Sequence, residues 1–353
     1  MPKPVIFAVG PEFLERDHLA NQVGMWEDGQ RAPTVPDHFE WWYFDAHFED
    51  GTTVVIVYAT KPIINPRSPL MPNLSLTITR YDGTKIARFA LPPANQFSVS
   101  QETCNIHLGQ SWVEQSEHDG CWTYRIHAEA GDLSTDLTFN GLVPPWRLGA
   151  GKTYFGDLNH YFAWLPSIPF GSVAGRLTYD GEDHQVNGTG YHDHNWGNVA
   201  LSSVMDHWTW GRAHVGEYTL IFVEQIAAKK YGYTRIPVFM LVKGRKVLAE
   251  DSRYFTMQGR DLIHHPGGRE YPRECDFTWE RGSDQIRLVM REPKLIEAVS
   301  LLMALPPVKR WLAHLFVNPY YFRFNSALDL EIKKDGLCDH LRGQALYEIM
   351  MLK

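Results

Sequence analysis

The sequence is poor in cysteine and has no long apolar run. No apolar stretch is long enough to span a membrane, and Met1–Val5 does not begin a signal-peptide core, so we expect a cytoplasmic protein. The few cysteines show neither a CxxC pair nor the spacing of a zinc site. We expect reduced, buried thiols, with a Cys104–Cys121 bridge as the alternative. The four cysteines are Cys104, Cys121, Cys275 and Cys338.

Positive charge is also scarce. The formal net charge is -7 and there is no basic run, which argues against a nucleic-acid partner or a phosphate-binding surface. The sequence contains neither a Gly-x-Ser-x-Gly nucleophile elbow nor a glycine-rich nucleotide loop. This excludes the hydrolases and nucleotide-binding enzymes that depend on those motifs. A neutral, hydrophobic small molecule is the partner that fits best.

Helical periodicity is nearly absent up to about residue 185, and short strand patterns separated by turn residues take its place. This arrangement is typical of an all-β sandwich or barrel. A chain of 353 residues exceeds what one core normally holds, so we expect two domains, 1–200 and 201–353. The strands expected in the first domain are 40–48, 52–60, 74–80, 123–128, 134–139, 154–164 and 172–179. Those expected in the second are 217–225, 238–242, 276–280, 285–290, 327–333 and 343–351.

Aromatic residues are abundant, with 12 Trp, 16 Tyr and 18 Phe, and such residues line pockets for apolar ligands. Several of them gather in the strand pattern from residue 40 to 48. Its alternation predicts an apolar face and a mixed face. The first carries Trp42, Phe44, Ala46 and Phe48, and the second carries Trp41, Tyr43, Asp45 and His47. Two adjacent tryptophans cannot both point into one core, so one of them must face something else.

The densest motif reads Gly-Tyr-His-Asp-His-Asn-Trp-Gly and runs from residue 190 to 197. If it is extended, period-two geometry places His192, His194 and Trp196 on one face. Asp193 and Asn195 then lie on the other. A proton carrier would stand beside an aromatic wall. The alternative is a buried polar cluster that only ties two sheets together.

A metal site is a further alternative for this motif. His192 and His194 could combine with one more ligand, taken from His207, His214 and Asp193. However, a His-x-His pair arises readily by chance in a chain with 16 histidines. We therefore expect no metal.

One segment departs from the β pattern. Residues 294–305 have helix-forming composition, Pro306-Pro307 would end that helix, and residues 308–316 resemble a second short helix. We expect this apolar insert, 294–317, to pack against the second domain. The alternative is a lid or a transient contact with a membrane surface that admits an apolar substrate.

Three motifs together resemble one superfamily. They are Glu40-Trp41-Trp42-Tyr43, the central motif from Gly190 to Gly197, and Trp208-x-Trp210-x-Arg212. The resemblance is to the carotenoid hydratase (hydroxyneurosporene synthase) and AttH-like superfamily, to which tocopherol cyclases and lipocalin-like Diels–Alderases are similar. It implies two lipocalin-like β-barrels in tandem, a hydrophobic pocket at or between them, and no metal or organic cofactor.

The resemblance also implies roles for single residues. In the hydratase branch, a His-x-Trp pair and a Tyr-x-Asp pair are implicated in protonating an isoprenoid double bond. The first pair matches His194 and Trp196, whereas the second position here reads Phe222-x-Glu224. Glu224 shares its strand face with apolar residues, a setting that would keep its carboxyl protonated. The alternatives are a surface position or an ion pair with Arg212.

These arguments give two groups of candidate residues. The candidate catalytic residues are His194 as acid or base, Glu224 as acid, Asp193 as an orienting group, and Tyr218 beside Glu224. The candidate substrate-binding residues are Glu40, Trp41, Trp42, Tyr43, His192, Trp196, Trp208, Trp210 and Arg212. The indoles could stabilise a cation through their faces, by about 0.5–2 kcal/mol each.

The sequence therefore predicts a cofactor-independent enzyme of isoprenoid or polyketide metabolism. It would convert a hydrophobic polyene by protonation, hydration or cyclisation in an aromatic pocket. A Diels–Alderase is the first alternative, because shape and a few hydrogen bonds can suffice for a pericyclic reaction. A lipocalin-like carrier that holds a hydrophobic ligand without turnover is the second.

Overall fold

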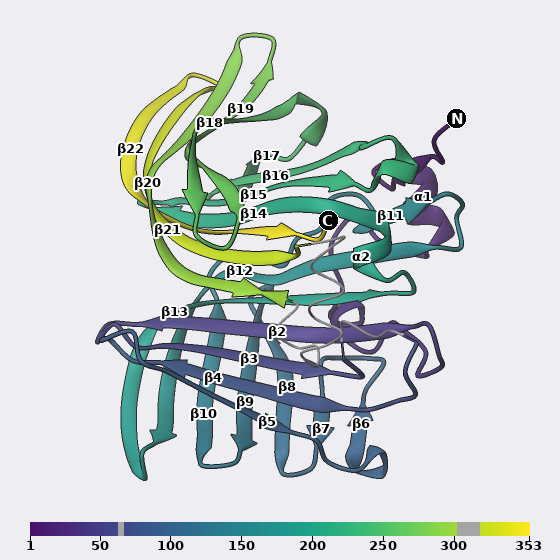
Figure 1. Ribbon diagram of the computed structural model, residues 1–353, viewed down its shortest axis with the longest axis vertical. Helices are drawn as coiled ribbons and strands as arrows, with labels where there is room; N and C mark the ends of the chain where they lie inside the picture. Colours follow the sequence, from purple (N-terminus) through teal and green to yellow (C-terminus); the bar gives the residue numbers. More distant parts are fainter. Residues whose placement is uncertain (63–66, 302–317) are drawn as a thin grey trace. The chain divides into compact units, whose positions relative to one another are not determined.

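A computed structural model describes residues 1–62, 67–301 and 318–353 (Figure 1). The chain divides into two compact units, Ile6–Ala200 and Leu201–Lys353, the second of which also takes in Met1–Val5. Each unit is built around one large antiparallel sheet and a hydrophobic core of its own. The helices among the described residues are short, and none is long and apolar enough to cross a membrane.

The sheet of the first unit is assembled mainly from neighbouring hairpins. Its strand order is β5-β4-β3-β2-β13-β12-β10-β9-β8-β7-β6, with β11 pairing β12 and β1 pairing β11. The strands are β1 (Val5–Phe7), β2 (Phe39–Phe48), β3 (Thr53–Ala59), β4 (Asn73–Thr79), β5 (Lys85–Ala90), β6 (Phe97–Val99), β7 (Ile106–Leu108), β8 (Ser111–His118), β9 (Cys121–Ala130), β10 (Leu133–Gly141), β11 (Lys152–Phe155), β12 (Tyr161–Tyr179) and β13 (Glu182–Gly197). The short helices are α1 (Pro11–Arg16), η1 (Met25–Asp28) and η2 (Ala94–Gln96).

The second unit repeats this plan with nine strands in the order β17-β16-β15-β14-β22-β21-β20-β19-β18. The strands are β14 (Met205–Val215), β15 (Tyr218–Ala227), β16 (Arg235–Lys243), β17 (Lys246–Ala249), β18 (Phe255–His265), β19 (Arg269–Arg281), β20 (Asp284–Ser300), β21 (Tyr320–Lys334) and β22 (Leu337–Met351). The short helices are α2 (Leu201–Val204), η3 (Lys229–Tyr231) and η4 (Ser252–Tyr254).

Both sheets curl around their cores. In the first unit, the Tyr58 hydroxyl on β3 donates a hydrogen bond across the core to the His127 carbonyl on β9, at 2.8 Å. In the second, strands from opposite ends of the sheet meet, because Phe239 on β16 stacks on Phe255 on β18 with ring centroids 4.9 Å apart. Curling lets each sheet bury one face against itself, as in barrel-like β-proteins.

The hairpin expected from the aromatic strand is confirmed. β2 pairs with β3 in antiparallel register, and its inner face supplies buried residues to the first core. The expected division of faces is confirmed as well, since Trp42 is fully buried in this core. Trp41 instead lies on the other face, where it stacks on Phe39 and Phe162.

The expected helix at the start of the apolar insert is wrong. Residues 294–300 belong to β20, and Leu295 pairs with Phe324 of β21. Pairing with a neighbouring strand has overridden the helix-forming composition, as tertiary context often does. Residues 302–317 lie outside the described part of the chain, so a lid or a membrane contact there stays a prediction.

All four cysteines are free, so the reduced state is confirmed and the Cys104–Cys121 bridge is wrong. Cys104, Cys121 and Cys275 are buried as expected, whereas Cys338 is exposed.

Phe139 tests the first core because its side chain is fully buried and packs edge-on against Phe44. We expect Phe139→Ala to lower the free energy of unfolding by about 3–5 kcal/mol, since the mutation leaves a cavity that the sheet cannot close. Chemical denaturation followed by circular dichroism measures this. The matched control is Phe89→Ala on β5, where the side chain is 69% exposed and little change is expected. Equal losses in the two variants would contradict the assigned core.

Candidate active site

The two histidines of the central motif lie on the inner face of β13, opposite two aromatic residues of β2. The register pairs His194 with Trp42 and His192 with Phe44. Both imidazole rings are completely buried. Phe44 stacks on the His192 ring with centroids 3.8 Å apart, and Trp42 stacks on the His194 ring at 4.7 Å. The predicted common face of these histidines is therefore confirmed.

His192 has an acceptor at each ring nitrogen. Its Nδ1 lies 2.9 Å from the Tyr43 carbonyl oxygen, and its Nε2 lies 3.1 Å from Asp28 Oδ2. A carbonyl oxygen can only accept, so Nδ1 carries a proton. The same Asp28 oxygen also accepts a hydrogen bond from the Tyr124 hydroxyl, at 2.5 Å. Asp28 and His192 therefore share a proton inside a fully buried core.

His194 is placed in the same way. Its Nε2 lies 2.8 Å from Glu40 Oε1. Its Nδ1 has two longer contacts, 3.3 Å to the Glu27 carbonyl oxygen and 3.5 Å to Asp28 Oδ1. Besides Trp42, the indole of Trp196 packs against this ring with centroids 4.6 Å apart. Electron-rich aromatic faces of this kind stabilise a positive charge.

The site brings buried charges of both signs together. Glu27, Asp28 and Glu40 are buried carboxyl groups, and the buried arginine beside them is Arg147. A second guanidinium, that of Arg31, interacts electrostatically with Glu40, Glu27 and Asp28. Burial raises the pKa of Asp28, but the two adjacent histidines and Tyr124 outweigh it and hold the pKa below the usual value. The site is thus a buried network of carboxyl, imidazole and hydroxyl groups joined by hydrogen bonds.

Sequence reasoning missed the element that completes the site. Residues 1–36 are mixed in composition and have no strand or helix period, yet the single turn η1 lies within them and carries Asp28. The Asp28 backbone carbonyl also accepts a hydrogen bond from the Trp42 indole, at 2.9 Å. The sequence feature that could have drawn attention to this turn is the pair of adjacent acids, Glu27 and Asp28, directly after a tryptophan. Nothing in the sequence told which histidine they would meet.

Glu40 was expected to touch substrate, and the structure gives it a partner in the protein. Its Oε1 accepts hydrogen bonds from the backbone amides of Arg31 and Ala32, at 2.6 and 3.3 Å, besides facing His194. Its Oε2 is buried and receives no hydrogen bond from the described residues, and the same is true of Asp28 Oδ1. A buried carboxylate oxygen without a donor is unfavourable, so these atoms favour a ligand that donates.

The opposite face of β13 carries a separate polar group. Asp193 accepts hydrogen bonds from Trp164 Nε1 at 2.7 Å, the Tyr191 hydroxyl at 2.8 Å and Asn195 Nδ2 at 2.7 Å. Burial raises the pKa of Asp193, against the effect of these donors. The carboxyl thus fixes the outer face of the strand, and its hydrogen bonds run to these three groups rather than to either histidine. Tyr43, on the same face, donates to Asp45 at 2.9 Å.

The remaining candidates belong to the second unit. Trp208, Trp210 and Arg212 alternate along β14 with residues of the second core, so they lie on the face away from it. Trp208 Nε1 donates to Glu348 at 3.3 Å. The Tyr218 hydroxyl donates to Asp339, and burial raises the pKa of Tyr218.

Glu224 does not have the apolar setting expected of a neutral acid. Its carboxylate forms an ion pair with Arg235, whose Nε lies 2.8 Å away and whose side chain is 46% exposed. Glu224 stands near the end of β15, beyond the fully buried part of the strand. The ion pair that the alternative interpretation assigned to Arg212 is formed by Arg235.

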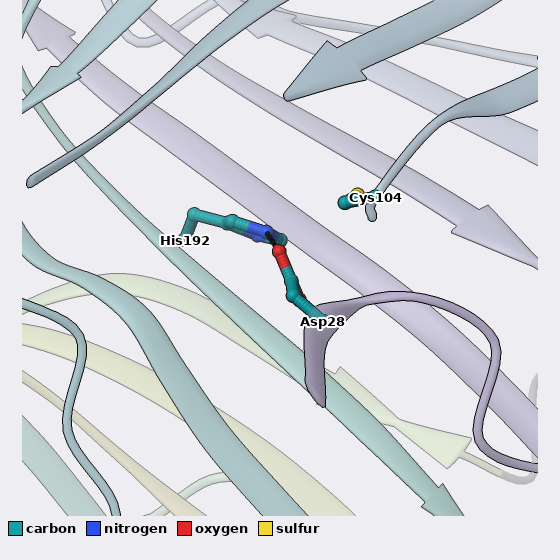
Figure 2. A group of neighbouring side chains, drawn as sticks. All are labelled: Asp28, Cys104 and His192. Atoms are coloured by element: carbon teal, nitrogen blue, oxygen red, sulfur yellow. Dashed lines mark hydrogen bonds and ion pairs between the residues drawn. The ribbon is translucent and has the colours of Figure 1, made fainter. Parts of the chain in front are cut away.

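One group of described side chains has the composition of a metal site. Asp28, Cys104 and His192 offer ligand atoms within 4.8 Å of one another (Figure 2). The dashed line in Figure 2 marks the Asp28–His192 contact, so a metal would have to displace the shared proton. Burial strongly raises the pKa of the Cys104 thiol, which favours the protonated form over the thiolate that binds metals. The His192-x-His194 metal site considered from the sequence is not among the groups that the described residues bring together.

Comparison with known proteins identifies the family. The sequence matches the AttH-like family over residues 33–295, which is more than half of the chain. The chain belongs to the AttH-like family. This membership and the two sheets confirm the predicted fold class, all-β with two lipocalin-like domains.

Three known proteins show the range of AttH-like relatives. The quinolone epoxide rearrangement protein PenF of Penicillium thymicola is 37% identical over 223 residues, covering 57% of this chain and 60% of PenF. The hydroxyneurosporene dehydrogenase of Chlorobaculum tepidum is 25% identical over 225 residues, covering 53% and 56%. The Diels–Alderase CheD of Chaetomium globosum is 24% identical over 253 residues, covering 67% and 57%. Each match therefore spans less than two thirds of the relative.

Solved structures extend the likeness over nearly the whole chain. The crystal structure of CghA with Sch210972 has a TM-score of 0.63 at 14% identity, covering 90% of this chain and 89% of CghA. Kievitone hydratase from Nectria haematococca has a TM-score of 0.56 at 13% identity, covering 93% and 92%. At such identities the likeness shows a shared fold alone.

Asp28 can be tested through stability. We expect Asp28→Asn to lower the free energy of unfolding by about 3–5 kcal/mol near neutral pH, because the buried His192 and Tyr124 side chains lose their ionised hydrogen-bond partner. The folded pKa lies below the unfolded one, so this contribution is complete above the ordinary carboxyl pKa and is lost as the pH falls through the folded value. The difference in the free energy of unfolding between wild type and variant should therefore become smaller below about pH 4. Urea denaturation across a pH series measures it.

The control for this experiment is Asp132→Asn. Asp132 is an exposed carboxylate that pairs with Arg88 on the surface, so little change is expected. If the loss in free energy of unfolding caused by Asp28→Asn did not depend on pH, this would contradict the ionised state of Asp28.

Proposed function

We propose that this AttH-like protein is an enzyme that protonates a hydrophobic natural product, by means of its own side chains, and so drives hydration, rearrangement or cyclisation. The name of one relative supports this class, since PenF is a quinolone epoxide rearrangement protein. The observation that carries the proposal is the pair of buried imidazoles, each with an acceptor at both ring nitrogens.

His194 is the proposed acid. Its Nε2 is held by Glu40 at 2.8 Å, whereas the contacts of Nδ1 are long, so the Nδ1 proton is the one more readily redirected to a substrate. Donating it to an alkene carbon leaves a carbocation on the substrate and a neutral imidazole on the enzyme. Addition of water, or loss of a neighbouring proton, ends the reaction, and the released proton returns to the ring.

The surroundings of His194 suit this chemistry. A dry site protects a carbocation from early capture, and the ring is completely buried. Trp42 and Trp196 lie against the imidazole and can stabilise positive charge, first on the ring and then on the substrate. Asp28 Oδ1, close to Nδ1 and without a hydrogen bond from the described residues, would accept one from a hydroxyl or a water at the reacting centre.

A Diels–Alderase is the second candidate, favoured by the match to CheD over 67% of this chain. A pericyclic reaction moves no proton onto carbon, so it would not use His194 as an acid. The two candidates therefore differ in whether solvent hydrogen enters the product.

Turnover in deuterated water separates the candidates. We expect a product with deuterium fixed on carbon when the purified protein is incubated with polyene substrates and the product is examined by mass spectrometry. His194→Ala should lower kcat/KM about 10²–10⁴-fold, the usual contribution of a general acid. The control is His118→Ala, because the His118 side chain is 87% exposed and outside the site.

Other outcomes decide against proton transfer to carbon. Turnover without carbon-bound deuterium, together with only a small loss in His194→Ala, would indicate the pericyclic reaction. Tight binding of the polyenes without any turnover would indicate a carrier.

A further inference from the structure

The turn η1 carries two adjacent buried acids that point to different partners. Asp28 meets the imidazoles, whereas Glu27 forms an ion pair with Arg147, whose Nε lies 2.6 Å from Glu27 Oε2. The exposed fractions of the Arg147 and Glu27 side chains are 4% and 5%. The Glu27 backbone carbonyl is itself one of the acceptors at His194 Nδ1, at 3.3 Å. The place of Glu27 therefore bears directly on the site.

Arg147 is held firmly by three segments of the first unit. Besides Glu27, its Nη1 donates to the Gly149 carbonyl and its Nη2 to the Ala20 carbonyl, each at 2.5 Å. Gly149 has a φ of +56°, and a Cβ there would come within 2.3 Å of the Ala8 carbonyl oxygen, so only glycine fits. The planar guanidinium fork thus has a fixed position from which to hold η1.

We propose that Glu27 and Arg147 form a positioning pair, which holds η1 against His192 and His194 and whose two charges set how firmly these rings keep their protons. The contact geometry stands by itself, and the consequence for turnover rests on the proposed function. Neither side chain touches the rings, so the pair acts through η1 and through its charges.

The charges make the proposal specific. Loss of the Glu27 carboxylate removes a negative charge near the rings, so they should give up their protons at lower pH. Loss of the Arg147 guanidinium removes a positive charge, so they should keep them to higher pH. The other charged or titratable groups around the rings stay the same in both variants. They are Asp28 on η1, Arg31 after it, Glu40 on β2, Cys104 before β7, Tyr124 on β9, Tyr161 on β12 and Asp193 on β13.

A merely structural role predicts something else. Removing either partner of a buried ion pair destabilises the fold, so Glu27→Gln and Arg147→Gln would both lower stability. The direction in which proton retention changes is opposite for the two variants only if their charges act on the rings. A purely structural role therefore predicts a loss of stability in both variants. A role through charge also predicts that the pH at which the rings lose their protons shifts in opposite directions.

The experiment is a pH titration of the full-length protein with ¹⁵N-labelled histidine, followed through the ring N–H signals of His192 and His194. We expect these signals to be lost at lower pH in Glu27→Gln than in wild type, and at higher pH in Arg147→Gln. The double variant, which removes both charges, should return toward wild type. Asp132→Asn and Arg88→Gln remove a bidentate surface pair, with contacts of 2.5 and 3.0 Å, and should leave the titration unchanged.

Shifts in the same direction in both single variants, or none in either, would overturn the proposal. If Arg147→Gln does not fold, Arg147→Lys keeps the charge but lacks the planar fork that reaches Glu27, the Gly149 carbonyl and the Ala20 carbonyl from three separate nitrogens. The His194 Nδ1–H signal should then move, because the Glu27 carbonyl is displaced, and an unchanged signal would count against the positioning role. These readouts need no substrate, so failure of the proposed reaction, seen in the deuterium experiment, is a separate result.

Discussion

A carboxylate that is buried away from solvent needs hydrogen-bond donors or positive charges from the protein itself. This requirement determines which groups surround the buried acids of the first unit. Glu27, Asp28 and Glu40 are at most 4% exposed. Glu27 meets a guanidinium, Asp28 meets two imidazoles and a tyrosine hydroxyl, and Glu40 meets backbone amides and one of the same imidazoles, that of His194. Because an unpaired buried charge is very unfavourable, none of these partners can be lost without consequences for the others.

The sheet supplies the precision that such a cluster needs. Alternation along β13 sends the histidines inward and Asp193 outward, so one strand serves two separate polar groups. Close approach fixes the strand at the end of the motif, since a Cβ on Gly197 would lie 2.5 Å from the Tyr161 carbonyl oxygen. The ring positions therefore follow from backbone pairing, and rigid elements hold reacting groups better than loops do.

The sequence correctly predicted which side chains share a strand face, because this depends on the two-residue period of the strand. It did not predict contacts between residues that are far apart in the chain. Two-residue alternation correctly separated the faces of β2 and β13. Asp28 was missed because it meets His192 across 164 positions of the chain, from a turn with no period of its own. Composition misled at residues 294–300, where pairing with β21 makes a strand. The setting of Glu224 was misjudged because Arg235 approaches it from the neighbouring strand β16, which alternation within one strand cannot reveal.

The cluster is hard to explain by stability alone. Apolar side chains of similar volume often replace a buried ion pair without loss, and sometimes with a gain. The first core already contains a continuous set of apolar residues around the histidines, so binding β2 to β13 does not require buried carboxylates. A pericyclic catalyst needs shape and a few hydrogen bonds, which again leaves three buried acids without a use. The proposed proton transfer would use such an arrangement, because the proton must be held in the buried site before the substrate arrives. Under the proposed function, the desolvation cost of the cluster is the cost of holding that proton in place.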